Sequence, residues 1–182
     1  MKVFIVLGLA CATSFTSYYS YTGTRVGSET AAQTTSNLQL SVDSSKRVYK
    51  RGDQFRLRVM LTNAGQQDVF VFGTLDWGYS ASLMFHIRDA AGNEVQPSLA
   101  PDAQTDAAAN DKSAFVRLAP EHFLGTTYFA PLKFMNLNKP GKYAIFVEYD
   151  SPFSVSEVSL SPFWGKENGT IKSNVVWIQV AK

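Results

Sequence analysis

The strongest constraint on the fold is an alternating stretch from Tyr143 to Tyr149, which follows a Pro140-Gly141 turn. Every second residue of this stretch is a bulky apolar or aromatic one. A period of two is typical of a β-strand with one buried face. The stretch therefore predicts a core-facing set of Tyr143, Ile145, Val147 and Tyr149 and an outward set of Ala144, Phe146 and Glu148.

A second run with the same period extends from Phe55 to Thr62, where apolar residues alternate with Arg56, Arg58, Met60 and Thr62. Weaker strand patterns cover 38–42, 69–72, 83–87, 114–118, 126–129 and 174–180. No amphipathic helix of useful length interrupts them, and turn residues separate them. The chain therefore predicts an all-β sandwich of about seven to eight antiparallel strands.

Two long connections interrupt this pattern of strands. Residues 97–112 are rich in Ala and Asp, and they predict a loop with one helical turn around Asp106 to Asn110. Residues 151–173 predict a long irregular loop. Loops gathered at the ends of a sandwich are its usual binding surface.

Charge argues against a nucleic-acid partner. Charged residues make up 18% of the 182 residues, and the net charge is only +2. A nucleic-acid binder would show a clustered basic stripe. The one basic cluster, Lys46, Arg47, Lys50 and Arg51, falls in a predicted turn and is interpreted as solvated.

The N-terminus predicts export. Lys2 precedes a short apolar run from Val3 to Ala10, the order found in secretory signals. The run is shorter than the ~20 residues that span a bilayer. We expect an export signal at 1–12, a Ser/Thr-rich flexible spacer at 13–36 and the sandwich at 37–182. The expected location is extracytoplasmic: periplasm, cell envelope or secreted.

Cys11, the single cysteine, leaves two processing routes open. Ala10-Cys11-Ala12 fits ordinary signal cleavage, which would release the chain from Thr13. Alternatively, Gly8-Leu9-Ala10-Cys11 resembles a bacterial lipobox, in which the cysteine carries a lipid. Membrane attachment is expected only through such a lipid or an uncleaved signal.

The order of motifs carries a family resemblance. A Lys-Arg-Gly-Asp turn leads into Phe55–Asn63, and Leu137–Val147 precedes the closing run Ser173–Val180. This order resembles immunoglobulin-like or fibronectin-type β-sandwich domains of exported bacterial proteins. It is more loosely similar to a bacterial proteinase-inhibitor domain. Ile145 stands where antibody-type domains carry a cysteine, and the resemblance implies a tyrosine corner at Tyr143.

No catalytic or metal constellation emerges from the sequence. The two histidines, His86 and His122, are at unrelated positions, and no Gly-x-Ser-x-Gly motif is present. Arg51-Gly52-Asp53 is interpreted as a turn that launches a strand. We therefore expect no enzyme activity, no cofactor and no metal.

Loop aromatics are the candidate contact residues: Trp77, Tyr79, Phe163 and Trp164. Trp and Tyr are favoured at binding surfaces, although these rings could instead cap an open end of the core. Trp177 is out of phase with Val176 and Ile178, which predicts an exposed or sheet-edge aromatic.

Three functions follow as alternatives. The first is an exported, non-catalytic domain for binding or assembly at the cell envelope, with an unknown protein or glycan partner. The second is a secreted proteinase inhibitor that presents the loop 151–173. The third is a carbohydrate-binding module that uses the loop aromatics.

Overall fold

The computed structural model describes residues 37–77, 82–98 and 107–182. All of them belong to one compact unit, Thr34–Lys182. The predicted export signal at 1–12 and spacer at 13–36 lie outside the described residues. No helix among the described residues has the length and apolarity needed to cross a membrane.

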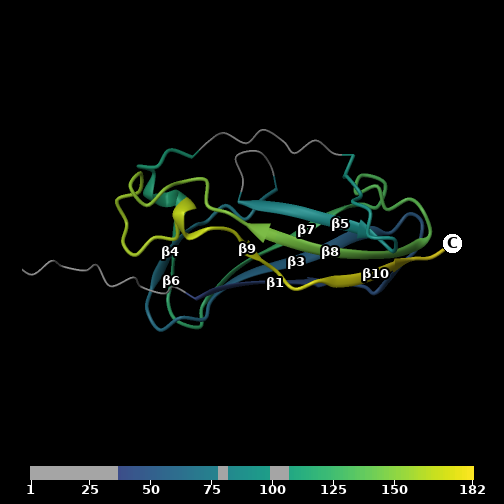
Figure 1. The fold of residues 1–182 in the computed structure, drawn as a ribbon, viewed down its shortest axis with the longest axis horizontal. Coiled ribbons are helices and arrows are strands. Elements are labelled where there is room, and N and C mark those ends of the chain that lie inside the picture. Colours follow the sequence, from purple (N-terminus) through teal and green to yellow (C-terminus); the bar gives the residue numbers. More distant parts are fainter. Residues whose placement is uncertain (1–36, 78–81, 99–106) are drawn as a thin grey trace, which may run out of the picture. The chain divides into compact units, whose positions relative to one another are not determined.

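The described residues form ten strands, and two of these contain only two residues each (Figure 1). One sheet contains, in order, β1 (Leu38–Ser44), β3 (Gln54–Asn63) and β7 (Phe123–Pro131). The second contains β2 (Val48–Tyr49), β10 (Val176–Val180), β8 (Gly141–Tyr149) and β5 (Leu83–Asp89), with β9 (Ile171–Lys172) also on β8. A two-stranded sheet joins β4 (Val69–Phe72) and β6 (Phe115–Leu118).

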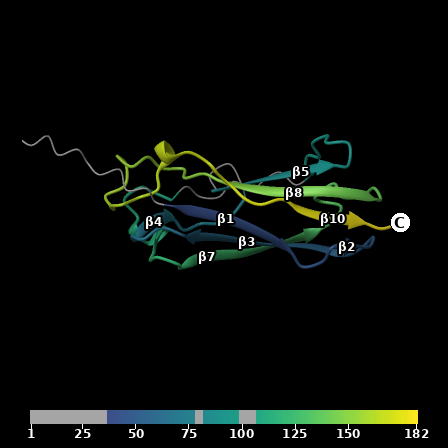
Figure 2. The same cartoon turned by 60° about the horizontal axis from the view of Figure 1, so that its bottom comes forward.

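The two larger sheets form the layers of a sandwich, and Figure 2 shows β5 and β8 over β1, β3 and β7. Their strands pair antiparallel, except that β2 runs parallel to β10. In constant-type immunoglobulin sandwiches the first, second, fourth and fifth strands form one sheet, and the third, sixth and seventh form the other. Here β1, β3 and β7 correspond to the first, second and fifth, and β5, β8 and β10 to the third, sixth and seventh, while the described three-stranded sheet has no counterpart of the fourth. The predicted all-β, immunoglobulin-like sandwich is confirmed.

The two alternating runs found in the sequence face each other across the core. Phe55, Leu57, Val59 and Leu61 on β3 are fully buried, as are Ile145, Val147 and Tyr149 on β8. All of them belong to a single apolar cluster between the sheets. The prediction that both runs are inner faces is confirmed.

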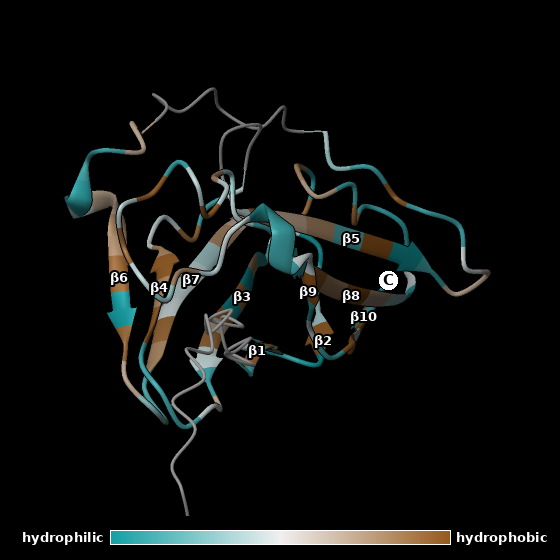
Figure 3. Cartoon of the chain, turned by 60° about the vertical axis from the view of Figure 1, so that its left-hand side comes forward, coloured by the Kyte–Doolittle hydropathy of each residue, from teal (hydrophilic) through white to brown (hydrophobic). Residues whose placement is uncertain are grey.

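The prediction for the opposite face of β8 is wrong in part. Ala144 and Phe146 were expected to point into solvent, yet both are buried, and Figure 3 shows β8 as largely hydrophobic. The side chains of neighbouring strands cover Phe146. His86 on β5 stacks on its ring with 4.6 Å between the ring centroids, and the Lys172 ammonium lies 3.9 Å from its centroid.

Tyr143 makes the predicted tyrosine corner. Its side chain is buried, and its hydroxyl donates a hydrogen bond of 2.8 Å to the Lys139 carbonyl, four residues upstream. This bond ties the start of β8 to the turn that precedes it. The role of Tyr143 is therefore structural.

The loop 151–173 is more structured than predicted. It contains a 3₁₀ turn (Lys166–Asn168) and β9, and Val158 and Phe163 enter a second apolar cluster with Phe72 and Phe115. Backbone hydrogen bonds tie Phe70 on β4 to Pro162 and Trp164 of the loop, at 2.8 and 2.9 Å. In the loop before β6, a 3₁₀ turn lies at Lys112–Ala114. Of the turn predicted around Asp106 to Asn110, Asp106 lies outside the described residues, and residues 109–110 form a turn in which the Asp111 N–H donates to the Ala108 carbonyl at 2.8 Å.

Candidate binding surface

The candidate surface is the strand β7, which forms one edge of the three-stranded sheet. It pairs with β3 along nine residues, from Phe123 opposite Thr62 to Pro131 opposite Gln54. Its alternating sequence places Tyr128 and Leu124 against the core and turns Phe123 and Phe129 outward. These two rings are 63% and 65% exposed.

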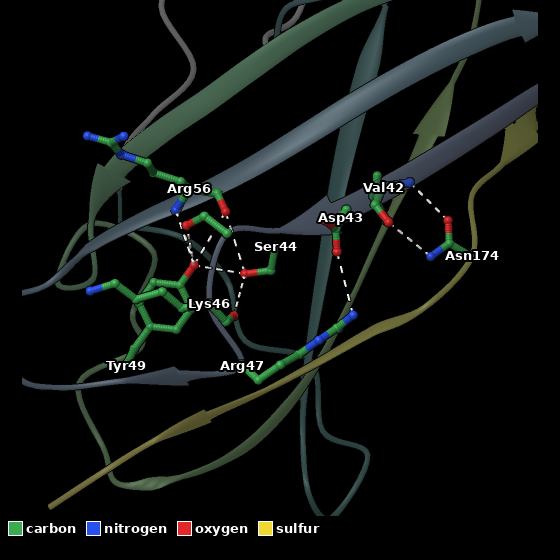
Figure 4. Close-up of polar contacts among 9 residues, drawn as sticks. Val42, Asp43, Ser44, Lys46, Arg47, Tyr49, Arg56 and Asn174 are labelled. Carbon is green, nitrogen blue, oxygen red and sulfur yellow. Dashed lines mark hydrogen bonds and ion pairs between the residues drawn. The ribbon is translucent and has the colours of Figure 1, made fainter.

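The other edge of the same sheet is closed by a side chain. The Asn174 amide donates to the Val42 carbonyl at 3.0 Å and accepts from the Val42 N–H at 2.9 Å (Figure 4). This amide takes the place of a neighbouring strand for Val42 on β1. Nearby, Arg47 pairs with Asp43 at 3.5 Å, so the end of β1 is charged as well.

In the second sheet, the edge formed by β5 is also covered. On β5, the Leu83 N–H donates to the Asp76 carbonyl at 3.0 Å, and Ile87 accepts from the Val95 N–H at 2.8 Å. In the parts of the chain that the structure describes, no hydrogen bond reaches β7 from the side opposite β3. The edge of β7 is thus open in the described structure.

The composition of β7 differs from that of a protected edge. Its sequence, Phe-Leu-Gly-Thr-Thr-Tyr-Phe-Ala-Pro, contains no charged residue, and Figure 3 shows it pale or brown. Natural edge strands are usually shortened, bent or charged, since an open row of N–H and C=O groups pairs readily with another strand. On the neighbouring strand β3, Arg56 and Arg58 lie opposite Phe129 and Thr127.

A pocket of about 320 Å³ lies beside β7, between that strand and β5. Trp77, Phe85 and Tyr128 supply its aromatic wall, with ring centroids 4.9 to 6.1 Å apart. Burial raises the pKa of the Tyr128 hydroxyl, and the Asp76 carboxylate adds to this rise. Asp76, Thr126 and Thr127 also line the pocket, so its wall is partly aromatic and partly polar.

The predicted contact residues do not form one surface. Trp77 lines the pocket with its ring edge-on to Phe85 and Tyr128, so it offers no flat platform. Phe163 is 6% exposed and packs on Phe115, with centroids 5.3 Å apart.

Of the remaining predicted site residues, Trp164 is partly buried against the main core, and its indole Nε1 is buried without a hydrogen-bond partner. Tyr79 and Cys11 lie outside the described residues. Trp177 on β10 is 56% exposed, which confirms the prediction of an exposed aromatic.

The interpretation of Arg51-Gly52-Asp53 as a turn agrees with the backbone geometry. Arg51-Gly52-Asp53 is a turn: Gly52 has a φ of 92°, and Asp53 accepts a hydrogen bond from the Lys50 N–H at 2.9 Å. Lys46 contacts the same carboxylate at 3.1 Å. In the described residues, no group of three or more His, Cys, Asp or Glu side chains could hold a metal ion.

Phe123 and Phe129 were not among the contact residues predicted from the sequence. A signal was present, because both phenylalanines share the outer phase of a nine-residue run that has no charge. That signal is ambiguous, since the same alternation would suit a strand inside a sheet. Only the pairing of strands shows that β7 is an edge.

Comparison with known proteins adds little to these observations. The chain matches no protein-family model and no curated protein. Among solved structures it is similar to the CARDB domain of a Pyrococcus furiosus protein, at 12% identity and a TM-score of 0.39, covering 80% of this chain and 94% of that one.

Two β-glucosidases are similar at the same level. The enzyme from Erythrobacter marinus matches at 13% identity and a TM-score of 0.40, over 80% of this chain and 16% of the enzyme. The enzyme from Listeria innocua, in complex with glucose, matches at 13% identity and a TM-score of 0.38, over 81% and 16%. Similarity this low carries no information on function.

Proposed function

We propose that this chain is an exported, non-catalytic β-sandwich domain that binds or assembles with other molecules at the cell envelope. The order of Lys2 and the apolar run Val3–Ala10 supports export. The carrying observation for binding is the uncharged edge of β7, which no hydrogen bond from another described residue covers, with its exposed Phe123 and Phe129. Strand addition to such an edge is a general mode of protein recognition, in which main-chain hydrogen bonds supply affinity.

The geometry favours this function over the other two candidates. The loop 151–173 has two exposed segments, and both contain turns. In the turn at residues 155–157 the Glu157 carboxylate accepts from the Ser154 N–H at 2.6 Å, and residues 166–170 begin with the 3₁₀ turn Lys166–Asn168. A proteinase inhibitor would present an extended loop there. A carbohydrate module would need side-by-side exposed rings, and Phe163 is buried whereas Trp77 is edge-on to its neighbours.

Site-specific photo-crosslinking tests binding at β7. A photoreactive amino acid replaces Phe129 in the full chain, produced in the cells that make the protein. The matched control carries it at Met84, an apolar position on β5 that is 53% exposed, against 65% for Phe129. We expect protein adducts from position 129 and few or none from position 84. Equal labelling at both positions, or none at 129, would contradict binding through β7.

Fractionation of the same cells tests export and anchoring. The full chain is expected outside the cytoplasm, and Cys11→Ser distinguishes the two processing routes. If Cys11 carries a lipid, the substitution moves the protein from the membrane fraction to the soluble one. Under ordinary cleavage after Ala12, the mature protein is the same with and without the substitution. Recovery in the cytoplasm would contradict the export proposal.

A further inference from the structure

The direction of the backbone groups on β7 follows from its pairing with β3. Asn63 donates its N–H to the His122 carbonyl at 3.0 Å, and the register continues with Leu61 opposite Leu124 and Val59 opposite Thr126. In an antiparallel pair, the residues that hydrogen-bond to a given neighbour alternate. The N–H and C=O groups of Phe123, Gly125, Thr127 and Phe129 therefore point away from β3, toward the open edge.

We infer that two copies of this chain associate by antiparallel pairing of their β7 strands about a two-fold axis at Thr126; this rests on the proposed function and names its partner. Phe123 and Phe129 each lie three residues from Thr126. Pairing centred there sets Phe123 of one copy opposite Phe129 of the other. Gly125 then faces Thr127, and the result is one sheet in which β1, β3 and β7 of both copies are continuous.

Only this register pairs the two exposed rings. An axis at Gly125 would place Phe129 opposite Glu121, and an axis at Thr127 would place Phe123 opposite Pro131, which has no N–H. A shift by a single residue would set outward side chains against inward ones. The centre at Thr126 is therefore the one that matches backbone groups and aromatic side chains together.

The side chains around the proposed two-fold axis neither repel nor obstruct each other. Because β7 is uncharged, self-pairing sets no like charges opposite each other. Gly125 adds no side chain to the outer face of β7. A Cβ at that position would lie 3.6 Å from Met60 Cγ and 3.7 Å from Phe123 Cδ2, so these two apolar side chains already lie over the glycine. The outer face of the paired strands would therefore be apolar around Gly125.

Sedimentation equilibrium of the full chain over a range of concentrations tests self-association. The sharpest variant is Thr127→Pro, because this residue's N–H points to the open edge and makes no bond to β3. We expect the dissociation constant of the dimer to rise ~10-fold or more, which corresponds to the loss of a main-chain hydrogen bond in each copy. The control Thr127→Val keeps the N–H and should change the constant less than ~3-fold.

Circular dichroism checks that Thr127→Pro is folded. If it is not, Phe129→Lys replaces it, since an edge charge opposes pairing without altering the backbone. Register is tested in a Cys11→Ser background. Thr126→Cys should form an intermolecular disulfide, because the two-fold axis sets this residue against itself at a distance that a disulfide spans. Leu124→Cys, on the same face, should not.

The outcomes separate the inference from the proposed function. Dimers weakened by Thr127→Pro and crosslinked through Thr126→Cys support self-pairing. A chain that stays monomeric, or a dimer that these variants leave unchanged, overturns it. If photo-crosslinks at position 129 join only a different protein, self-pairing is overturned while the proposed function stands. If position 129 forms no adducts, both are overturned.

Discussion

The outer faces of β8 and β7 both carry phenylalanines, but the molecule covers one and leaves the other open. Phe146 on β8 is 4% exposed beneath His86 and Lys172, whereas Phe129 on β7 is 65% exposed. The difference lies in the neighbouring strands. β8 has β5, β9 and β10 beside it, whereas β7 has only β3 among the described residues. An apolar residue on an outer face is thus structural where strands flank it and available for contact at an edge.

The largest expected effect is that of Phe146→Ala. Removing this buried ring, on which His86 and Lys172 pack, should lower the free energy of unfolding by about 3 kcal/mol. The matched substitution Phe129→Ala should change it by less than about 0.5 kcal/mol, because that ring is mostly in water. Urea denaturation at low protein concentration measures both. Equal losses would remove the distinction between the two faces.

Asn174→Ala should turn the edge of β1 into one that resembles β7. The substitution removes both hydrogen bonds to the Val42 backbone and leaves a partly buried N–H and C=O unpaired. We expect a loss of about 2 kcal/mol in the free energy of unfolding. Gln179→Ala, at an exposed position on the next strand, is the control. A neutral Asn174→Ala would mean that the amide does not protect this edge.

His86→Ala tests the cover over Phe146 itself. The imidazole lies parallel to the phenyl ring, with an interplanar angle of 9°, and its Nε2 is 3.1 Å from Glu148 Oε2. Loss of the stacked ring should lower stability by about 1 kcal/mol. A double-mutant cycle with Phe146→Ala isolates the contact of the two rings. Purely additive effects would show that the imidazole does not stabilise Phe146.

The smallest expected effect is a loss of folding stability at low pH. A hydrogen bond from the Lys50 backbone, with help from Lys46, lowers the pKa of the Asp53 carboxyl, and Asn93 does the same for Asp89. A pKa that is lower in the folded state gives stability above the unfolded value of about 3.9 and loses it as pH falls through the folded pKa. Stability should therefore decline slightly below about pH 4.

Denaturation midpoints at several pH values measure this decline. Asp53→Asn should flatten the pH dependence, whereas Thr127→Val, on the uncharged strand β7, should leave it unchanged. Because β7 carries no titratable group except the partly buried Tyr128, self-association should not follow the same acid transition. A dimer that dissociates in parallel with the protonation of Asp53 would contradict this expectation, because it would show that self-association through β7 depends on the Asp53 turn.

Much of the framework could be predicted from local pattern. The runs Phe55–Leu61 and Tyr143–Tyr149 predicted the two inner faces, and Pro140-Gly141 before Tyr143 predicted the corner. The candidate site could not be predicted in the same way. Loop aromatics such as Phe163 were predicted as contact residues because of their residue type, yet Phe163 is buried in the second apolar cluster.

The sequence by itself determined which residues turn inward, because side-chain direction in a strand has a period of two and needs no knowledge of the neighbours. The packing of the domain fixed which outward residues are covered and which edge has no neighbour among the described residues. Asn174 reaches Val42 across 132 residues of chain, and no local pattern anticipates that contact. Phe129 lies at an open edge for the same reason: strand neighbours are chosen by the packing of the whole domain.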